Sequence, residues 1–319
     1  MKIGVVILNF NGWEDSLACA ESVLASSVCP TWVVIVDNAS TNNSVFWYRH
    51  WARGDMDFAL PELGAPARCP KPVQLIELAA GETPGIPAGS VVLVHNNENR
   101  GYAAGNNVGI RLLMQWGADG IWILNNDAIV EKNALGALAK CLFAKPRPGL
   151  CGARVQYFGL DTVQCRAGGK TNPWTGLSNL DGFGFSVKEA LLDSAESVEK
   201  RTNFIYGASM MASRDFIEKV GLLDERYFLY CEEQDWAYSA KGLFNISYAP
   251  DAVVYHREGR TTGFSCNKIK LWPLWHLVKS RILLTAKHKP WALPTVCLSI
   301  VFAAFRMIWR RLVIKLIKF

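Results

Sequence analysis

Short runs of consecutive apolar residues recur through the first half of the chain, and turn-forming residues bound each run. They cover residues 3–8, 32–37, 91–95 and 121–124. Runs of this length are typical of strands in a parallel sheet that is covered on both faces. The pattern therefore predicts four buried, parallel strands.

Stretches with the apolar spacing of helices lie at residues 15–27, 104–116 and 132–144. Their alternation with the strands predicts an α/β fold, with a doubly wound, mostly parallel sheet flanked by helices. Residues 54–89 are rich in Pro, Gly and Ala, which is typical of an insertion ahead of the third strand.

Polar or acidic residues follow each of the four predicted strands. In open α/β sheets a ligand binds beyond the carboxyl ends of the strands. One such strand end is ordinary turn chemistry, but four together indicate a polar ligand. The residues concerned include Asn9, Asn11, Asp37, Asn99, Arg100, Gly101, Asn106, Asn125, Asn126 and Asp127.

Single positions among these have structural alternatives. Asp37 suits a hydrogen bond to a ribose or a nucleobase, and it also suits a cap for a helix near Asn43. Residues 99–107 match neither a dinucleotide fingerprint nor a P-loop, although their glycines allow a ligand to approach closely. Asp127 beside Asn125 suits a divalent cation or, alternatively, a helix cap.

The densest acidic cluster is Glu232, Glu233 and Asp235, with aromatic residues on both sides. Carboxylates this close repel one another unless a cation or a catalytic role compensates. At a helix start, which we expect near Asp235, one of them can act as a general base towards a hydroxyl. A solvated acidic helix start is the plainer alternative. His256 suits a metal or phosphate contact, and equally a place in the core.

The net charge of +6 is unevenly distributed along the chain. No acidic residue follows Glu258, whereas 12 of the 34 basic residues do, so the preceding part has a net charge of −6. The uncharged residues 291–305 are too few for a spanning helix, which needs about 20. With the basic residues after them, they predict an amphipathic helix on an anionic membrane surface.

A buried helix pair and a nucleic-acid contact are the alternatives for this basic segment. The wholly basic composition disfavours the first, and the long apolar runs disfavour nucleic acid. We therefore expect a catalytic domain at residues 1–265 and a basic, membrane-associating helical tail at residues 266–319.

The nine cysteines include no C-x-x-C pair, which argues against a zinc ribbon or a thioredoxin-type site. Most have apolar neighbours, as core residues in a reducing compartment do. The N-terminal apolar run is too short for a signal peptide and is broken by Asn9 and Asn11. We therefore expect a cytoplasmic protein, peripheral on the inner face of the cell membrane.

Six segments in their order along the chain resemble an inverting family-2 glycosyltransferase of the GT-A fold. They are VVILNFNGW, VDNAST, NRGYAAGNN, LNNDA, IYGASMMASRDFIEKVGLLDERYFLYCEEQDW and VVYH. Within that family the chain is most similar to rhamnosyltransferase-like enzymes that build cell-surface polysaccharides. The resemblance covers residues 3–290, and its most specific part is residues 207–236.

The resemblance implies a role for each matching position. The positions it assigns to the nucleotide-sugar donor are Asn9, Asp37, Asn99, Gly101, Asn106, Gly207 and Ala208. We expect the strand-end residues Asn11, Arg100 and Asn126 to line the same donor site. It assigns Mg²⁺ or Mn²⁺ to Asp127 and His256, with Asn125 in place of the family's first acidic metal position.

Glu232 and Glu233 match the family's Glu-Asp pair, whose second member is usually the base, and Asp235 completes the acidic set. The implied reaction transfers a sugar such as rhamnose from a nucleoside diphosphate to a hydroxyl of a lipid-linked saccharide, with inversion. The metal neutralises the leaving diphosphate while Glu233 takes the hydroxyl proton.

Two other functions are alternatives to this one. A nucleotidyltransferase needs a basic phosphate-binding loop after the first strand, where this chain has NFNGWED. A catalytically silent sugar-binding or scaffold subunit of a membrane polysaccharide complex is the alternative from a different class, and the intact acidic cluster argues against it.

Overall fold

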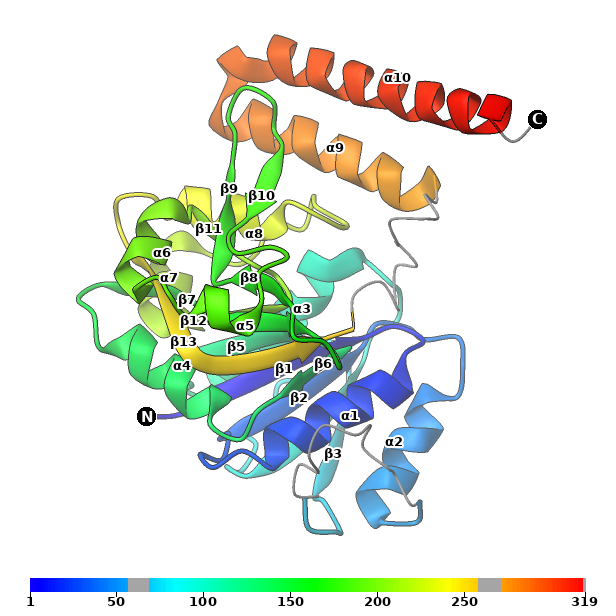
Figure 1. Ribbon diagram of the computed structural model, residues 1–319. Helices are drawn as coiled ribbons and strands as arrows, with labels where there is room; N and C mark the ends of the chain where they lie inside the picture. The colour runs from blue at the N-terminus through cyan, green and yellow to red at the C-terminus, as the bar shows by residue number, and fades with distance from the viewer. Residues whose placement is uncertain (57–68, 258–270, 318–319) are drawn as a thin grey trace.

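The computed structural model describes residues 1–56, 69–257 and 271–317 of the chain (Figure 1). The expected boundary between residues 265 and 266 lies outside the described residues, as do Arg260, Cys266, Lys268 and Lys270. The division into a domain and a tail at that point therefore stays a prediction.

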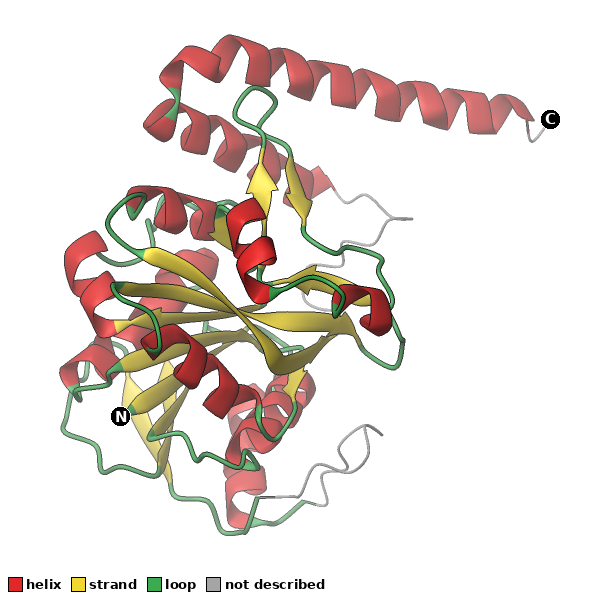
Figure 2. Ribbon diagram, turned by 60° about the vertical axis from the view of Figure 1, so that its left-hand side comes forward, coloured by secondary structure: helices red, strands yellow, loops and turns green. Residues whose placement is uncertain are grey.

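A large mixed sheet forms the centre of the protein, with helices on both faces (Figure 2). Its strands are β1 (Ile3–Asn9), β2 (Trp32–Asp37), β3 (Leu75–Ala79), β4 (Ser90–His95), β5 (Gly120–Asn125), β6 (Ala128–Val130), β7 (Pro148–Tyr157), β8 (Val163–Arg166), β12 (Ser209–Ser213) and β13 (Asn245–His256). They pair in the order β3-β4-β2-β1-β5-β12-β7-β13-β6, and β8 adds to β7. A smaller sheet pairs β10 (Ser178–Leu180), β9 (Gly168–Thr171) and β11 (Phe204–Ile205) in that order.

The described helices alternate with the strands in the first half of the chain and gather in the second half. They are α1 (Trp13–Leu24), α2 (Ser44–Arg53), α3 (Gly101–Gln115), α4 (Ala134–Phe143), α5 (Val187–Ala190), α6 (Ala195–Arg201), α7 (Arg214–Val220), α8 (Glu232–Ser239), α9 (Leu271–His288), the short η1 (Pro290–Ala292) and α10 (Leu293–Ile317).

The four predicted strands are confirmed as β1, β2, β4 and β5, and they pair in parallel. The three predicted helices are confirmed as α1, α3 and α4, with shifted ends. The expected insertion at residues 54–89 holds a further parallel strand, β3, at the edge of the sheet. Its side chains are mostly half-buried or exposed, so it lacks the continuous apolar run that marks the central strands.

Successive residues of the central strands fill two separate cores. Val5 and Ile7 of β1 pack in one core with α1, α2 and α4. Val6, between them, packs in the other core with α3, α7 and α8. Side chains of a strand alternate between its faces, so a strand covered on both sides is apolar at every position.

The strand register brings the polar strand ends to one edge of the sheet. Asn9 lies opposite Asp37, which lies opposite His95, and Leu8 lies opposite Asn125. Strand β12 runs antiparallel to β5, and the Asn125 amide donates to the carbonyl of Ala208 at 3.1 Å. The turn before β12 thereby joins the same edge.

Helix α3 contacts its neighbours through glycines rather than offering those glycines to a ligand. A β-carbon on Gly105 would lie 2.5 Å from Leu8, and one on Gly109 would lie 2.7 Å from Val6. One on Gly101 would lie 2.3 Å from the carbonyl oxygen of Phe228. These glycines therefore serve helix–strand and helix–loop packing, and the expected approach of a ligand at Gly101 stays a prediction.

The chain ends in a helical hairpin of α9, η1 and α10, which lies along one end of the domain (Figure 1). The β9–β10 hairpin reaches it, where Arg281 and Ser299 both donate to the carbonyl of Thr175, at 2.6 and 2.7 Å. Helix α9 buries part of its surface, whereas residues 301–306 of α10 are all exposed. A buried helix pair is thus wrong for that part of α10.

No helix within the described residues is long and apolar enough to cross a bilayer. Cys19, Cys69, Cys151, Cys165 and Cys231 are buried, as expected of core residues. Cys29 and Cys297 are exposed.

We predict that Gly101→Ala destabilises the protein by about 2–5 kcal/mol. Gly101 has φ +88°, which strains any L side chain, and the clash is with the backbone of Phe228, which cannot move aside as a side chain does. Urea unfolding measures the change. Gly85→Ala is the control, because nothing lies within 4 Å of its β-carbon position. Equal stability of the two variants would contradict this account.

Candidate functional site

Asn9 connects the loops that follow β1 and β2. Its amide nitrogen donates to Asp37 at 2.7 Å and to Ser40 at 3.1 Å, and its amide oxygen accepts from Gly12 at 3.1 Å and Ser16 at 2.9 Å. Asn9 is fully buried, with both polar atoms in use. Asn9 thus braces the two loops, and its expected nucleotide contact stays a prediction.

Asp37 is held by Ser40, which donates its hydroxyl at 2.6 Å and its amide at 3.1 Å. The helix-cap alternative is wrong, because α2 begins at Ser44 and the Asp37 carboxylate accepts from Ser40 instead. Asn11 is exposed and accepts from the amides of Thr41 and Asn42. A donor contact for Asp37 and Asn11 stays a prediction.

Asn126 extends this network from the neighbouring strand end. It is buried and donates to the hydroxyl of Ser16 at 3.1 Å and to the carbonyl of Gly12 at 3.4 Å. Asn9 and Asn126 therefore meet on the Ser16 hydroxyl, which ties the ends of β1 and β5 together.

The segment before α3 is organised by Asn99, whose side-chain oxygen accepts from Asn38 at 2.8 Å and from the amide of Gly101 at 3.0 Å. Arg100 is exposed and pairs with Glu98 at 3.5 Å and Glu225 at 3.4 Å. It lines a hollow of about 220 Å³ beside α3. Its expected phosphate contact stays a prediction.

Asn106 lies one helical turn after Tyr102, on the same face of α3. Its nitrogen donates to the carbonyl of Tyr102 at 3.0 Å. Its buried oxygen has no hydrogen-bond partner among the described residues. A buried unpaired acceptor is costly, and a ligand or water would satisfy it.

The two expected metal ligands lie side by side. His256 Nε2 is 3.0 Å from Asp127 Oδ1, and both residues are almost wholly buried. Asn125 Nδ2 lies 3.3 Å from the same imidazole nitrogen. The ring of Tyr206 packs edge-on against the imidazole at 6.1 Å. Strand β13 supplies the histidine, and the turn after β5 supplies Asp127 and Asn125.

Gln164 orients the imidazole of His256. Its amide nitrogen donates to the backbone carbonyl of His256 at 3.0 Å, so its oxygen is the atom that faces Nδ1 at 2.8 Å. Nδ1 must therefore carry a proton. Nε2 then faces Asp127 either as part of an imidazolium or as a lone pair available to a cation.

The spacing of this pair fits a divalent cation. Neighbouring ligands of an octahedral ion with bonds of about 2.1 Å lie about 3 Å apart, which is the distance between these two atoms. No group of three or more His, Cys, Asp or Glu that could hold a metal occurs within residues 1–56, 69–257 and 271–317. A cation bound here therefore takes its remaining ligands from other oxygens, such as water or a diphosphate.

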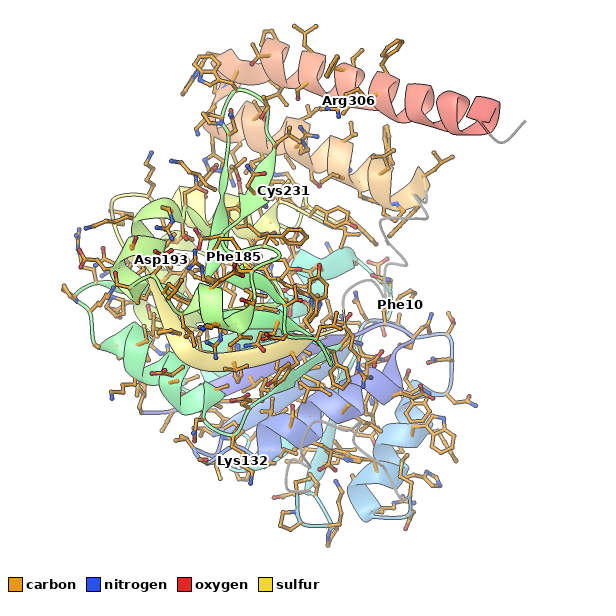
Figure 3. All side chains as sticks on the ribbon, in the orientation of Figure 1. Phe10, Lys132, Phe185, Asp193, Cys231 and Arg306 are labelled. Atoms are coloured by element: carbon orange, nitrogen blue, oxygen red, sulfur yellow. The ribbon has the colours of Figure 1, made fainter. Side chains whose placement is uncertain are left out.

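The acidic pair meets two other segments at the start of α8, which begins at Glu232, three residues before the expected start. Tyr102 donates its hydroxyl to the carbonyl of Gly207 at 2.7 Å. A β-carbon on Gly207 would lie 3.8 Å from the Glu233 carboxyl carbon and 3.7 Å from the Tyr102 hydroxyl. In Figure 3, Cys231 marks the residue before this helix, and Phe10 marks the residue that follows β1.

Burial controls the protonation of these groups. It raises the pKa of Glu233 to about 7. The pKa of Glu232 is raised well above its usual value, first by burial and then by the charge of Glu233. Burial, followed by the charges of Glu232, Glu233 and Asp127, also raises the pKa of Tyr102. Tyr102 is thus within electrostatic reach of both the acidic pair and the candidate metal ligand.

Glu233 is the better general base of the two. It is half-buried where Glu232 is buried, so its carboxylate is the more accessible to an acceptor hydroxyl, and burial raises its pKa to about 7. Each has a buried oxygen without a hydrogen-bond partner among the described residues. The solvated acidic helix start considered above is therefore wrong for this pair.

Asp235 belongs to a different cluster from Glu232 and Glu233, and its expected catalytic role stays a prediction. One oxygen accepts from His288 at 2.7 Å and from Tyr227 at 3.2 Å, and the other accepts from Lys287 at 2.8 Å. Both oxygens are occupied, and the residue is 3% exposed. Asp235 binds the end of α9 to α8, and two basic residues of the tail are thereby used inside the protein.

Tyr102, Gln164 and Tyr206 belong to the candidate site, although the sequence pattern did not indicate them. Tyr102 and Tyr206 lie within matching segments, and the spacing of Tyr102 and Asn106 on one helix face was the available signal for the first. Nothing near Gln164 in the chain indicates its role, because β8 meets β13 only through the folded sheet.

Comparisons with known proteins support the fold. No family model matches the chain, and no curated protein matches it. The chain is similar to a solved structure of GalNAc-T7 with UDP, GalNAc and Mn²⁺, with a TM-score of 0.58 and 14% identity. That similarity covers 90% of this chain and 48% of GalNAc-T7, so this chain spans about half of that protein.

Two further solved structures have the same fold. A mannosyltransferase from Pyrobaculum calidifontis in complex with GDP-Man and Mn²⁺ has a TM-score of 0.50 and 17% identity, over 95% of this chain and 75% of that one. Residues 1–349 of S. aureus TarS have a TM-score of 0.50 and 11% identity, over 93% and 71%. At these identities the comparisons establish the GT-A architecture expected from the sequence.

We predict that Asp235→Asn destabilises the protein by about 2–4 kcal/mol. The substitution leaves Lys287 and His288 without their shared carboxylate, and Lys287 is partly exposed, which moderates the loss. Urea unfolding measures it. Glu196→Gln, which breaks the exposed pair with Lys200, is the control and should change little. The folded Asp235→Asn protein should keep its catalytic activity. A folded but inactive variant would support a catalytic role for Asp235.

The raised pKa of Glu233 predicts a pH-dependent gain in stability for Glu233→Gln. The native state holds a proton that the unfolded state releases near pH 4.5, so this group's contribution to stability is lost as the pH rises through about 7. The variant should gain roughly 1–3 kcal/mol relative to the wild type between pH 5 and pH 8. Urea unfolding at both pH values tests this, and a constant difference would contradict it.

Proposed function

We propose that this protein is an inverting glycosyltransferase that moves a sugar from a nucleoside-diphosphate-sugar to an acceptor hydroxyl. The observation that carries the proposal is a buried oxygen of Glu233, which has no hydrogen-bond partner among the described residues and lies beside Gly207 and Tyr102. Tyr102 is itself within electrostatic reach of Asp127. An unpaired buried carboxylate is costly, and a scaffold or silent sugar-binding subunit would have no use for it.

The residues divide the reaction between them. Glu233, ionised near neutral pH, takes the proton of the acceptor hydroxyl as that oxygen attacks the anomeric carbon. The bond to the diphosphate breaks on the opposite face, so configuration inverts. Burial and the charge of Glu233 raise the pKa of Glu232, which disfavours a second negative charge beside Glu233. The hydroxyl of Tyr102 holds the turn at Gly207 and thereby keeps room beside Glu233 for the sugar.

Asp127 and His256 are the residues that would hold a divalent cation, Mg²⁺ or Mn²⁺, with Gln164 orienting the imidazole. When bound, the cation supplies charge neutralisation for the leaving diphosphate. Arg257 adds a positive charge beside this pair: its amide donates to the carbonyl of Asp127 at 3.0 Å and its guanidinium pairs with Asp15 at 3.1 Å. The similar GalNAc-T7 and mannosyltransferase structures, which contain Mn²⁺, support this assignment.

A nucleotide-sugar is the proposed donor, and the nucleotides in the similar structures, UDP and GDP-Man, support it. Rhamnose on a nucleoside diphosphate is our proposal for the sugar, from the sequence resemblance. A thermal-shift panel of nucleotide-sugars with Mg²⁺ or Mn²⁺ identifies the donor, because binding to the native state raises Tm.

A lipid-linked saccharide is the proposed acceptor, met on the inner face of the cell membrane. Exposed apolar side chains on the C-terminal hairpin support this, among them Trp272, Trp275, Trp291, Phe302 and Phe305. Trp174, at the tip of the β9–β10 hairpin, is 56% exposed. Arg281 of α9 donates to the carbonyl of the adjacent Thr175 and so holds this tip against the C-terminal hairpin. Aromatic and basic residues together suit an anionic membrane surface, and nucleic acid is not a proposed partner.

We predict that Glu233→Gln lowers kcat by about 10²–10⁴-fold, while donor affinity is retained. Transfer is followed with the donor that the thermal-shift panel identifies, and the anomeric configuration of the product is read by NMR. Glu232→Gln is the matched control and should keep most activity, because Glu232 is buried and is not the proposed base. The reverse result would make Glu232 the base, and retained configuration would overturn inversion.

We predict that the protein floats with vesicles containing phosphatidylglycerol and not with neutral vesicles. Replacing both Phe302 and Phe305 with Ser should lower vesicle binding by about tenfold, since each substitution removes apolar area that the membrane would bury. Phe183→Ser is the control, because Phe183 is equally exposed, at 60%, on another part of the surface. Equal binding of both variants and the wild type would contradict the membrane surface proposed here.

A further inference from the structure

A cleft of about 760 Å³ lies apart from the candidate active site, at the other end of α8. Glu233 lies in the first turn of this helix, and the cleft is lined by Tyr238 and Ala240 at its end. A helix of this length separates its two ends by about 10 Å. Helix α6, the start of β13 and the turn η1 complete the wall. A cleft of this volume is of the size that small-molecule ligands occupy.

Two lysines give this cleft an uncompensated positive charge. Among the described residues, neither Lys241 nor Lys289 has an ion-pair partner. The ammonium of Lys289 lies 5.2 Å from the centre of the Tyr238 ring. Burial, followed by the charge of Lys241, lowers the pKa of Lys289, so the cation is held where it is disfavoured in the absence of an anion.

The other charged residues of the wall already have ion-pair partners. Glu196 pairs with Lys200 at 2.8 Å. Glu199 pairs with Lys145 and accepts from the amide of Tyr248 at 2.9 Å. His288 is held by Asp235. Within each pair the opposite charges compensate. The charges of Lys241 and Lys289 are therefore the ones left without a partner among the described residues.

The rest of the lining has the chemistry that a polyol requires. Tyr238, Phe244 and Trp291 present aromatic surface, and Trp291 is 64% exposed. Asn203 adds an amide, whose nitrogen donates to the Tyr238 hydroxyl at 3.3 Å. Aromatic faces with a few polar groups are typical of sites that bind sugars or glycerol, and lysines suit phosphate as point charges.

We propose that this cleft binds a phosphorylated polyol. The phosphate lies between Lys241 and Lys289, and its sugar or glycerol part lies against Tyr238 and Trp291. The same chemistry occurs in the headgroup of an anionic phospholipid and in a soluble sugar or glycerol phosphate. The site is independent of the glycosyltransferase reaction, since none of its lining residues belongs to the proposed catalytic set.

A purely structural role for the two lysines makes a different prediction. Both follow the ends of helices, Lys241 after α8 and Lys289 after α9, where the helix dipole favours a cation. On that account their loss lowers stability without any ligand, and phosphate compounds have no effect on the wild type.

The test compares Lys241→Met/Lys289→Met with the wild type on the full chain. Methionine keeps the apolar stem and removes the charge. Calorimetry without divalent metal measures binding of glycerol 3-phosphate and of inorganic phosphate, and flotation measures binding to phosphatidylglycerol and phosphatidylcholine vesicles. Lys132→Met/Lys188→Met, which removes two exposed lysines elsewhere, is the matched control.

We expect the variant to lose at least tenfold in affinity for glycerol 3-phosphate, or for phosphatidylglycerol vesicles, with the control unchanged. The first result assigns a soluble ligand and the second a lipid headgroup. Lys241→Arg/Lys289→Arg should restore binding. Wild-type binding to neither probe, or equal losses in the variant and the control, would overturn the proposal. Glu233→Gln should retain this binding, so failure of the proposed reaction would leave the result interpretable.

Discussion

The close backbone contact between Gly101 and Phe228 is the constraint on which the candidate site depends. It brings the first turn of α3 against the segment that leads into α8, and the Tyr102 amide donates to the Phe228 carbonyl at 2.8 Å. The Tyr102 hydroxyl then reaches Gly207, beside Glu233. Any side chain at position 101 would separate these segments. The close contact at Gly101 therefore holds together the segments that carry the groups proposed for donor and acceptor chemistry.

Two carboxylates of α8, only two residues apart, have opposite electrostatic surroundings. Asp235 has both oxygens paired, with Lys287, His288 and Tyr227, and it connects the C-terminal hairpin to the domain. Glu233 has a buried oxygen without a partner among the described residues, and burial raises its pKa. A paired carboxylate is a structural element, whereas an unpaired one retains basicity for chemistry.

The C-terminal hairpin is connected to α8 along much of its length. Ser280 of α9 donates to the carbonyl of Leu229 at 2.9 Å, and Lys287 and His288 hold Asp235. Lys289, which follows, lines the cleft at the far end of α8. Helices α8 and α9 thereby connect the C-terminal hairpin, which carries the proposed membrane surface, to the elements that hold the proposed phosphate site and the proposed base.

The sequence by itself determined the strands, the helices between them and the polar strand ends, because local periodicity follows directly from burial on two faces. It missed β3, whose half-exposed side chains carry no such pattern. Residue type alone did not distinguish Asn9, saturated by four bonds, from a ligand contact, nor Asp235 from Glu233. Those distinctions depend on partners distant in the chain, such as Gln164 for His256 and His288 for Asp235. Only the tertiary structure decided them, since hydrogen bonding and desolvation are properties of the assembled surroundings.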